Sequence, residues 1–445
     1  MSAPPRQSAP VRPTAARPPH RLRRAVRNPR LRIRRARIAA SPRLTPPRRP
    51  APPPRLGHRP SLDGVRGIAI LGVLAMHAQA FGAFGHFAPG AHLGVTVFFV
   101  LSGFLITTLL LEEHHRHDTI NLRHFYLRRV ARLLPALLVL LPFHALVWTY
   151  EASFGVVLAA MVPMLLYVTN LVRAHDVMVM AGTTFGWSLA IEEQFYLGWP
   201  PLLKRALKRG RSLLLPVAVC LIAVLAAAAI RMVLADHGAW RGWLYYSTVT
   251  RFDALAIGCL AALARWRVAL PWFRGAGWLA AGWLGYAYLT YHSDLPETFT
   301  LGLPSAALAT AVLVLAVVRE PTGRLARVLS QPALVRLGVL SYGLYLWNLL
   351  PFQAWQIFSG ERPGLAGTLT CLAIGYTAAE LSYRWVEQPM IGWARARIRG
   401  QRRPPWTFQR RAVDRTDLAR QHAARLRDAD ARKLATIPTF GPTLR

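Results

Sequence analysis

The chain has 445 residues, of which 53% are hydrophobic and 17% are charged, whereas a soluble protein carries about 25% charged residues. This composition excludes an intrinsically disordered chain, and the three cysteines, each in an apolar run, exclude a disulfide-stapled scaffold. The net charge of +35 lies mostly near the two ends. The composition therefore predicts an apolar membrane domain at 58–394 with basic tails.

The tails have unusual compositions. Residues 1–57 contain 16 Arg and 14 Pro without Asp or Glu, and residues 395–445 contain 14 Lys and Arg against four Asp. No folded recognition module accompanies them, and no apolar signal core precedes residue 67, which disfavours nucleic-acid binding and a cleaved targeting peptide. We predict disordered cytoplasmic tails that lie against anionic membrane lipid, and no nucleic-acid partner.

Apolar runs define the membrane domain, since a spanning helix needs about 20 largely apolar residues. Eleven candidates are 67–84, 92–111, 133–150, 154–172, 187–203, 213–235, 249–264, 276–292, 299–318, 337–358 and 366–386. Clusters of Arg and Lys at 112–132 and 204–212 place both loops inside, so only two of the three runs between them can cross. Because Pro163 interrupts 154–172, we predict that this run is re-entrant or interfacial. The expected fold is an all-α polytopic bundle with ten spanning helices and both termini cytoplasmic.

Arg66 and His77 are the first polar residues that need an explanation. They are 11 positions apart, so both point the same way on a helix, with His77 about 16 Å deeper. His77 is either a hydrogen-bonded core histidine or a general base, since the pKa of imidazole lies near neutrality.

Three arginines stand at the entrance of the run at 133–150. Arg129 and Arg132 are three positions apart and share a helix face. Arg128 and Arg132 are four positions apart and also share a face. Guanidinium groups suit phosphate, although a topology signal explains the same cluster equally well.

Carboxylates and further cations mark two other helices. Trp187 opens a run that carries Glu192, Glu193 and Tyr196, with Glu192 and Tyr196 facing together. We expect these carboxylates either to meet cations of other helices (Arg66, Arg251 or protonated His77) or to form a buried structural ion pair. Arg251 and Asp253 lie at the start of a later helix, where they form either a local pair or the partners of these carboxylates. Glu387, in Glu-Gln-Pro, is expected to close the last helix.

Seven stretches together carry a family resemblance. They are Leu62–Ala69 with the Arg66-x10-His77 spacing, Phe98–Ile106, Phe125–Pro135, Trp187–Leu197, Arg251–Gly258, Ser341–Trp347 and Val386–Pro389. In this order the chain resembles the membrane-bound acyltransferase family 3, whose members O-acylate surface sugars, lipid-linked glycans and small molecules. The resemblance implies ten helices and acyl transfer from cytosolic acyl-CoA. The family commonly has His where this chain has Asn348, and an amide cannot take a proton near neutral pH.

The sequence thus predicts a plasma-membrane O-acyltransferase with acyl-CoA, favouring acetyl-CoA, as donor. The acceptor is a sugar, a lipid-linked glycan or a small molecule. We expect no permanently bound cofactor and no metal site. His77 is the expected base, oriented by Arg66 and Glu192, and Arg128, Arg129 and Arg132 are expected to bind the CoA phosphates. The residues expected to support the site are Glu193, Tyr196, Arg251, Asp253, Trp187 and Asn348. Ser102, in Leu-Ser-Gly, is interpreted as a packing residue rather than as a nucleophile. A transporter or flippase for a polar lipid or glycan is the alternative, because such proteins also carry ionisable residues at mid-membrane.

Overall fold

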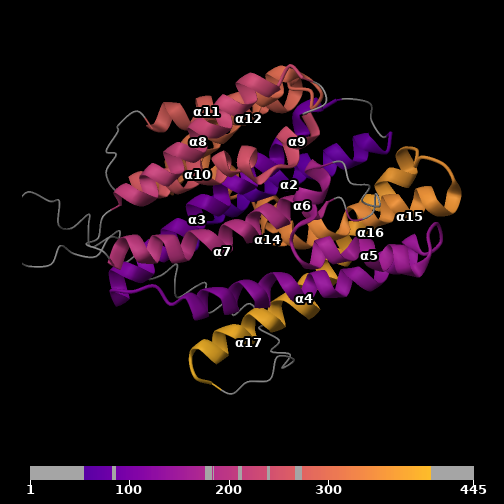
Figure 1. Cartoon of the computed structure of the whole chain (residues 1–445), viewed down its shortest axis with the longest axis horizontal. Helices are drawn as coiled ribbons and strands as arrows, with labels where there is room; N and C mark the ends of the chain where they lie inside the picture. Colours follow the sequence, from indigo (N-terminus) through magenta and orange to yellow (C-terminus); the bar gives the residue numbers. More distant parts are fainter. Residues whose placement is uncertain are drawn as a thin grey trace, which may run out of the picture. The chain divides into compact units, whose positions relative to one another are not determined.

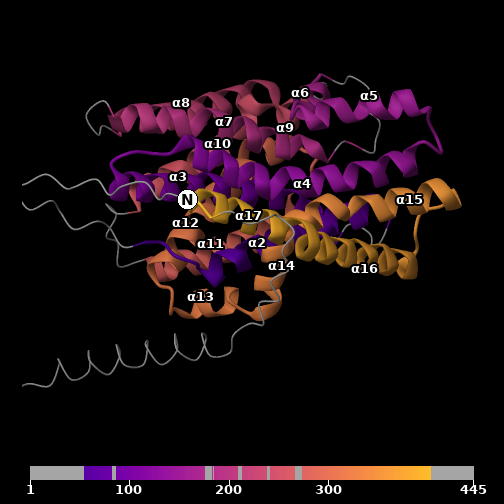
Figure 2. The same ribbon diagram turned by 90° about the horizontal axis from the view of Figure 1, so that it is seen from below.

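The computed structural model describes residues 55–82, 87–175, 183, 185–208, 213–237, 241–265 and 273–401, all within the unit Pro52–Arg445. The predicted tails therefore lie mostly outside the described residues. The described part contains helices and no strand, and its long helices run roughly side by side (Figures 1 and 2). The helices are α2 (Pro60–Ala80), η1 (Pro89–Leu93), α3 (Gly94–His117), α4 (Leu122–Trp148), α5 (Phe154–Leu165), α6 (Thr169–Ala174), α7 (Gly186–Lys208), α8 (Leu214–Leu234), α9 (Arg241–Tyr246), α10 (Thr248–Ala264), α11 (Phe273–Thr290), η4 (Thr298–Gly302), α12 (Leu303–Arg319), α13 (Arg324–Leu329), α14 (Pro332–Trp347), α15 (Leu349–Ser359), α16 (Leu365–Ser382), η5 (Tyr383–Glu387) and α17 (Gln388–Ile398).

Each of the eleven predicted apolar runs is largely helical, but 154–172 is divided between α5 and α6, and 337–358 between α14 and α15. Among the described residues, seven helices are long and apolar enough to cross a membrane when adjoining segments are taken together. This confirms an all-α polytopic bundle, while the count of ten spans stays a prediction. Helix α5, in the run predicted not to cross, has 12 residues and rises only about 18 Å, against a hydrocarbon core of about 30 Å.

Glycines bring the backbones of two helix pairs into direct contact. A Cβ on Gly67 of α2 would stand 2.2 Å from the carbonyl oxygen of Leu334 on α14. The pair α3 and α10 is reciprocal: a Cβ on Gly103 would stand 2.1 Å from the Leu255 oxygen, and one on Gly258 would stand 2.1 Å from the Val100 oxygen. Small residues of this kind allow close helix packing in membranes, where van der Waals contact is a main driving force.

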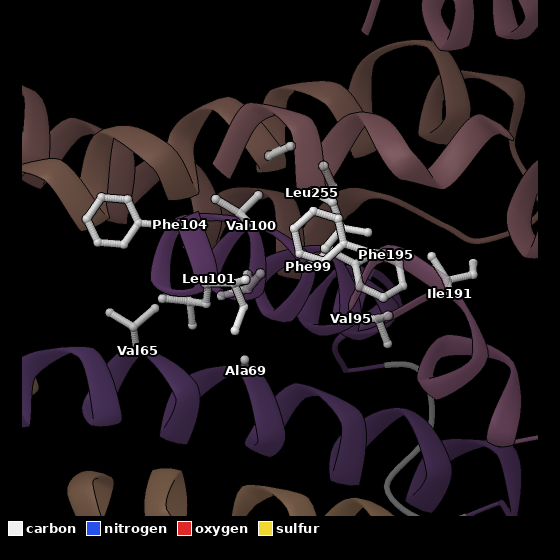
Figure 3. Packing of buried hydrophobic residues seen from close by; sticks show 14 of the residues in the cluster. Val65, Ala69, Val95, Phe99, Val100, Leu101, Phe104, Ile191, Phe195 and Leu255 are labelled. Carbon is white, nitrogen blue, oxygen red and sulfur yellow. The ribbon is translucent and has the colours of Figure 1, made fainter. Parts of the chain in front are cut away.

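The core lies between these pairs. Val65 and Ala69 point from α2 toward α3, and Leu101, Phe99 and other residues of α3 fill the space between α2 and α10 (Figure 3). Helix α3 is therefore held from both sides, which fixes the direction of its remaining face toward α4 and α7.

The predicted run 337–358 is interrupted between α14 and α15 at Asn348. Pro351 has no N–H to donate to the carbonyl of Trp347, which explains the interruption. The side-chain amide of Asn348 instead donates to the carbonyls of Leu344 and Tyr345, both at 2.8 Å. The interruption thus fixes the orientation of the Asn348 side chain.

The expectation that Glu387 closes the last helix is wrong. Helix α16 continues through the π-helical turn η5 into α17, which ends at Ile398 and packs against α4. Pro389 lacks the N–H that an α-helix would direct to residue 385, and the wider turn accommodates this loss.

We predict that Gly103→Val lowers the thermal unfolding midpoint of the purified protein. The new side chain would meet the α10 backbone, and overpacking of this kind costs about 1–3 kcal/mol or more. The matched control is Gly282→Val on α11, where a Cβ has no neighbour within 4 Å. Equal midpoints for the two variants would contradict the close packing of α3 on α10.

Candidate active site

A cavity of about 90 Å³ lies among α2, α3, α4, α7 and α14. Apart from Ser102, its lining on the α3 side is apolar, with residues such as Val95, Phe98 and Leu105. The polar residues that line it are Arg66, Ser102, Arg129, Arg132, Ser188, Glu192, Tyr196, Ser341, Tyr342 and Tyr345. Residues from five distant parts of the sequence therefore share one polar cavity within the bundle.

Glu192 is the hydrogen-bonded centre of this cavity. Ser102 Oγ donates to Glu192 Oε1 at 2.8 Å, and the Tyr196 hydroxyl donates to Oε2 at 3.1 Å. The Ser102 and Tyr196 oxygens are 3.3 Å apart. The interpretation of Ser102 as a packing residue is therefore wrong, since its hydroxyl holds one carboxylate oxygen. The predicted Glu192–Tyr196 pairing on one helix face is present.

The arginine cluster is divided by the structure. The guanidinium of Arg129 lies over the rings of Tyr196 and Phe125, 4.8 and 5.7 Å from their centroids, and Arg132 lines the same cavity. Arg128 is exposed and pairs with Glu113 at 3.4 Å. The three guanidinium groups therefore do not form one site: two face the cavity and the third does not.

Opposite charges surround this cavity. Arg66 and Arg129 interact electrostatically with Glu192, and Arg129 also with the half-buried Glu193. The buried Glu387 interacts with Arg66 and Arg132. Charged groups taken out of water need such partners, so the arginines are retained here by carboxylates from α7 and η5.

His77 is bonded to Asn348, with 2.5 Å between imidazole Nδ1 and amide Oδ1. The two carbonyls that accept from Asn348 Nδ2 leave Oδ1 to face the ring, so Nδ1 must carry the proton. Neutral His77 then presents Nε2 as the basic nitrogen. His77 does not line the cavity itself; it lies three helical turns beyond Arg66 along α2.

Arg251, Asp253 and Trp187 lie away from Glu192. Arg251 is fully buried, donates to Thr96 Oγ1 at 2.9 Å and lies over the rings of Phe99, Trp187 and Tyr245. Asp253 accepts from the buried Arg231 at 2.7 Å. Of the three cations expected to meet the carboxylates of α7, the structure brings Arg66 to Glu192. Arg251 and His77 lie elsewhere. Asp253 forms its ion pair with Arg231, and its charge also acts on the neighbouring Arg251, as one of the two sequence alternatives expected.

Tyrosines of α14 complete the wall, and sequence analysis did not single them out. The Tyr345 hydroxyl is 2.5 Å from Ser188 Oγ and donates to the Phe185 carbonyl, and Tyr342 donates to the Leu133 carbonyl. The stretch Ser341–Trp347 had been noted only for its resemblance to the family. Its period on a helix would have placed Ser341, Tyr342 and Tyr345 on one face.

Comparison with known proteins identifies the family. A family model described as an acyltransferase domain matches residues 59–380. The peptidoglycan O-acetyltransferase of Listeria monocytogenes is 30% identical over 361 residues, which cover 74% of this chain and 55% of that protein. A Bacillus subtilis protein with the provisional name of peptidoglycan O-acetyltransferase is 32% identical over 365 residues, 74% of this chain and 54% of that protein. No solved structure matches the chain significantly.

The chain belongs to this acyltransferase family, as the seven stretches predicted. It spans a little over half the length of the curated relatives that it matches. Family membership confirms the prediction of an acyltransferase at the level of the family and does not favour the transporter alternative.

We predict that Asp253→Asn destabilises the protein strongly. The side chains of Arg231 and Asp253 are 1% and 4% exposed, so removal of the carboxylate leaves a buried charge unpaired, at a cost of about 3–5 kcal/mol. Glu113→Gln is the control, because its partner Arg128 is exposed and such pairs contribute less than about 1 kcal/mol. Thermal or denaturant unfolding measures both, and similar losses would show that the buried pair has no special weight.

Proposed function

We propose that this protein is a membrane O-acyltransferase that moves an acetyl group from cytosolic acetyl-CoA to a hydroxyl of a carbohydrate acceptor. The observation that carries this proposal is the cavity in which Arg66, Arg129 and Arg132 meet Glu192, with His77 farther along the helix that holds Arg66. The family and the O-acetyltransferase names of its relatives support the acyl group and the reaction class.

The arginines are proposed to receive the phosphates of the donor. Guanidinium groups bind phosphate through paired, charge-assisted hydrogen bonds. Arg129 and Arg132 belong to the first part of α4, next to a loop whose arginines favour the cytoplasmic side. The donor would then enter from the cytoplasm, and its flexible arm would extend from these arginines along α2.

His77 is proposed as the general base. From Arg66 to His77 the helix rises about 16 Å, which brings Nε2 toward the middle of the membrane domain. Nε2 would accept the proton of the acceptor hydroxyl as its oxygen attacks the thioester carbonyl. The C–S bond breaks, the acyl group passes to the oxygen, and the CoA thiolate leaves and takes the proton from His77 Nε2. Asn348 would hold the ring by accepting a hydrogen bond from Nδ1–H and would favour the imidazolium that forms.

The acceptor is proposed from the chemistry of the relatives. Two of them carry names that refer to peptidoglycan, a carbohydrate polymer. We propose a sugar hydroxyl of a cell-surface polysaccharide or its lipid-linked precursor, reached from the side opposite the arginine-rich loops. The plasma membrane, cytoplasmic termini and lipid-bound tails belong to the same proposal.

We predict that His77→Gln lowers acetyl transfer by about 10²–10⁴-fold, since Gln keeps hydrogen bonding but cannot act as a base. Asn348→Ala should lower transfer less, and Asn348→Asp should retain more activity than Ala, because it keeps an acceptor for Nδ1. Labelled acetyl-CoA and washed membranes with equal protein levels measure this. The exposed His175→Gln is the control. Near-normal transfer by His77→Gln ends the assignment.

We predict that Arg129→Ala and Arg132→Ala each raise the apparent KM for acetyl-CoA at least about tenfold, since charge-assisted hydrogen bonds contribute about 1.5–3 kcal/mol. The KM for the acceptor should change little. Arg128→Ala removes the same charge from a neighbouring position outside the cavity, so it serves as the control. If all three variants behave alike, the cluster acts only through topology or general charge.

A further inference from the structure

A second cationic pocket lies at the helix ends near the start of α2. Its volume is about 280 Å³, and four arginines line it: Arg55, Arg59, Arg265 and Arg319. Leu56, Leu315 and Val318 form the rest of its wall. None of the lining residues in the described part of the chain is acidic, so the pocket combines strong positive charge with an aliphatic surface.

Buried contacts hold this pocket in shape. Glu112, at the end of α3, accepts from the Leu56 N–H at 2.7 Å and from the buried Arg265 at 2.8 Å. Its other oxygen accepts from Arg116 at 3.2 Å. Arg319 donates to the Arg265 carbonyl, and Arg59 donates to the Leu56 carbonyl at 2.8 Å.

The lining presents guanidinium groups from three parts of the chain to one volume. Among the described residues that line the pocket, four are arginines and none is acidic. An anion held between such groups lowers their mutual repulsion. A phosphate accepts several guanidinium hydrogen bonds at once, so it is the anion that this geometry suits.

The position of the pocket indicates which phosphate it receives. Arg59 directly precedes α2, Arg265 directly follows α10, and Arg319 is the last residue of α12. These helices are among those long and apolar enough to span, so the arginines lie where helices leave the hydrocarbon core. Phospholipid phosphates occupy this depth, and basic pockets between membrane helices on the cytoplasmic side bind anionic headgroups.

We propose that the pocket of Arg55, Arg59, Arg265 and Arg319 binds the phosphate headgroup of an anionic phospholipid, with Leu56, Leu315 and Val318 against its glycerol and first methylene groups. The site is separate from the acyl-transfer cavity. Ser102, Leu105 and Ile106 of α3 line that cavity, whereas Glu112 of the same helix supports the lipid pocket, and the two linings share no residue. The proposal does not depend on the proposed acyl transfer.

The test measures binding of a fluorescent phosphatidylglycerol to the full-length protein in neutral detergent. The variant Arg55→Gln/Arg59→Gln should bind about thirtyfold more weakly, since each arginine near an anionic lipid contributes roughly fivefold. Arg55→Lys/Arg59→Lys keeps the charge and should retain most of the binding. Arg123→Gln/Arg395→Gln is the control: it removes the same charge from two exposed positions outside the pocket and should bind like the wild type.

Competition distinguishes the sources of phosphate. Unlabelled phosphatidylglycerol should displace the probe, while phosphatidylcholine, inorganic phosphate and CoA at equal concentration should not. High salt should weaken wild-type binding because it screens the charges.

Displacement by CoA or inorganic phosphate would overturn the lipid assignment in favour of a soluble phosphate. Equal binding of phosphatidylcholine, or equal losses in the control and pocket variants, would overturn the site. Thermal midpoints of all variants check that loss of binding is not loss of folding.

Discussion

The close contact of α2 with α14 is the constraint on which the candidate active site depends. Gly67 and Gly338 allow the two backbones to touch, at Leu334 and Asp63 respectively. This contact sets the register between the helices, and the register places His77 of α2 against Asn348 at the end of α14. The same approach turns Arg66 toward the cavity that Tyr342 and Tyr345 of α14 help to line. A side chain larger than glycine would separate the helices and the paired groups together.

Charges in the apolar bundle are arranged in two ways. Arg231 and Asp253 neutralise each other in a closed pair, and Arg251 is covered by aromatic rings, so these groups stabilise the structure around the site. Arg66, Arg129, Arg132 and Glu192 instead line the cavity. Access to a cavity, rather than burial of a charge alone, separates the residues proposed for substrate binding from those that hold the helices.

Helix α3 supports two sites proposed to bind anionic groups. One part of it carries Ser102, which donates to Glu192 in the candidate active-site cavity, and its end carries Glu112, which accepts from Arg265 beside the proposed lipid pocket. Because Gly103 and Gly258 lock α3 against α10, both sites share one rigid support. A phospholipid in the pocket beside Arg265 would stabilise the end of α3, the helix that also carries Ser102 of the candidate active site.

The sequence by itself determined the helical membrane fold, the family and the charged residues around the cavity, because apolar run length, loop charge and ionisable residues within apolar runs are local signals. It also paired Glu192 with Tyr196, since that contact lies within one helix. Only the tertiary structure decided that Arg128 leaves the cavity that Arg129 and Arg132 line, that Asp253 pairs with Arg231, and that Asn348 accepts from His77. These contacts depend on the rotation and register of helices far apart in the chain. Between α2 and α14, close packing at Gly67 and Gly338 sets both, and residue spacing along one helix does not encode them.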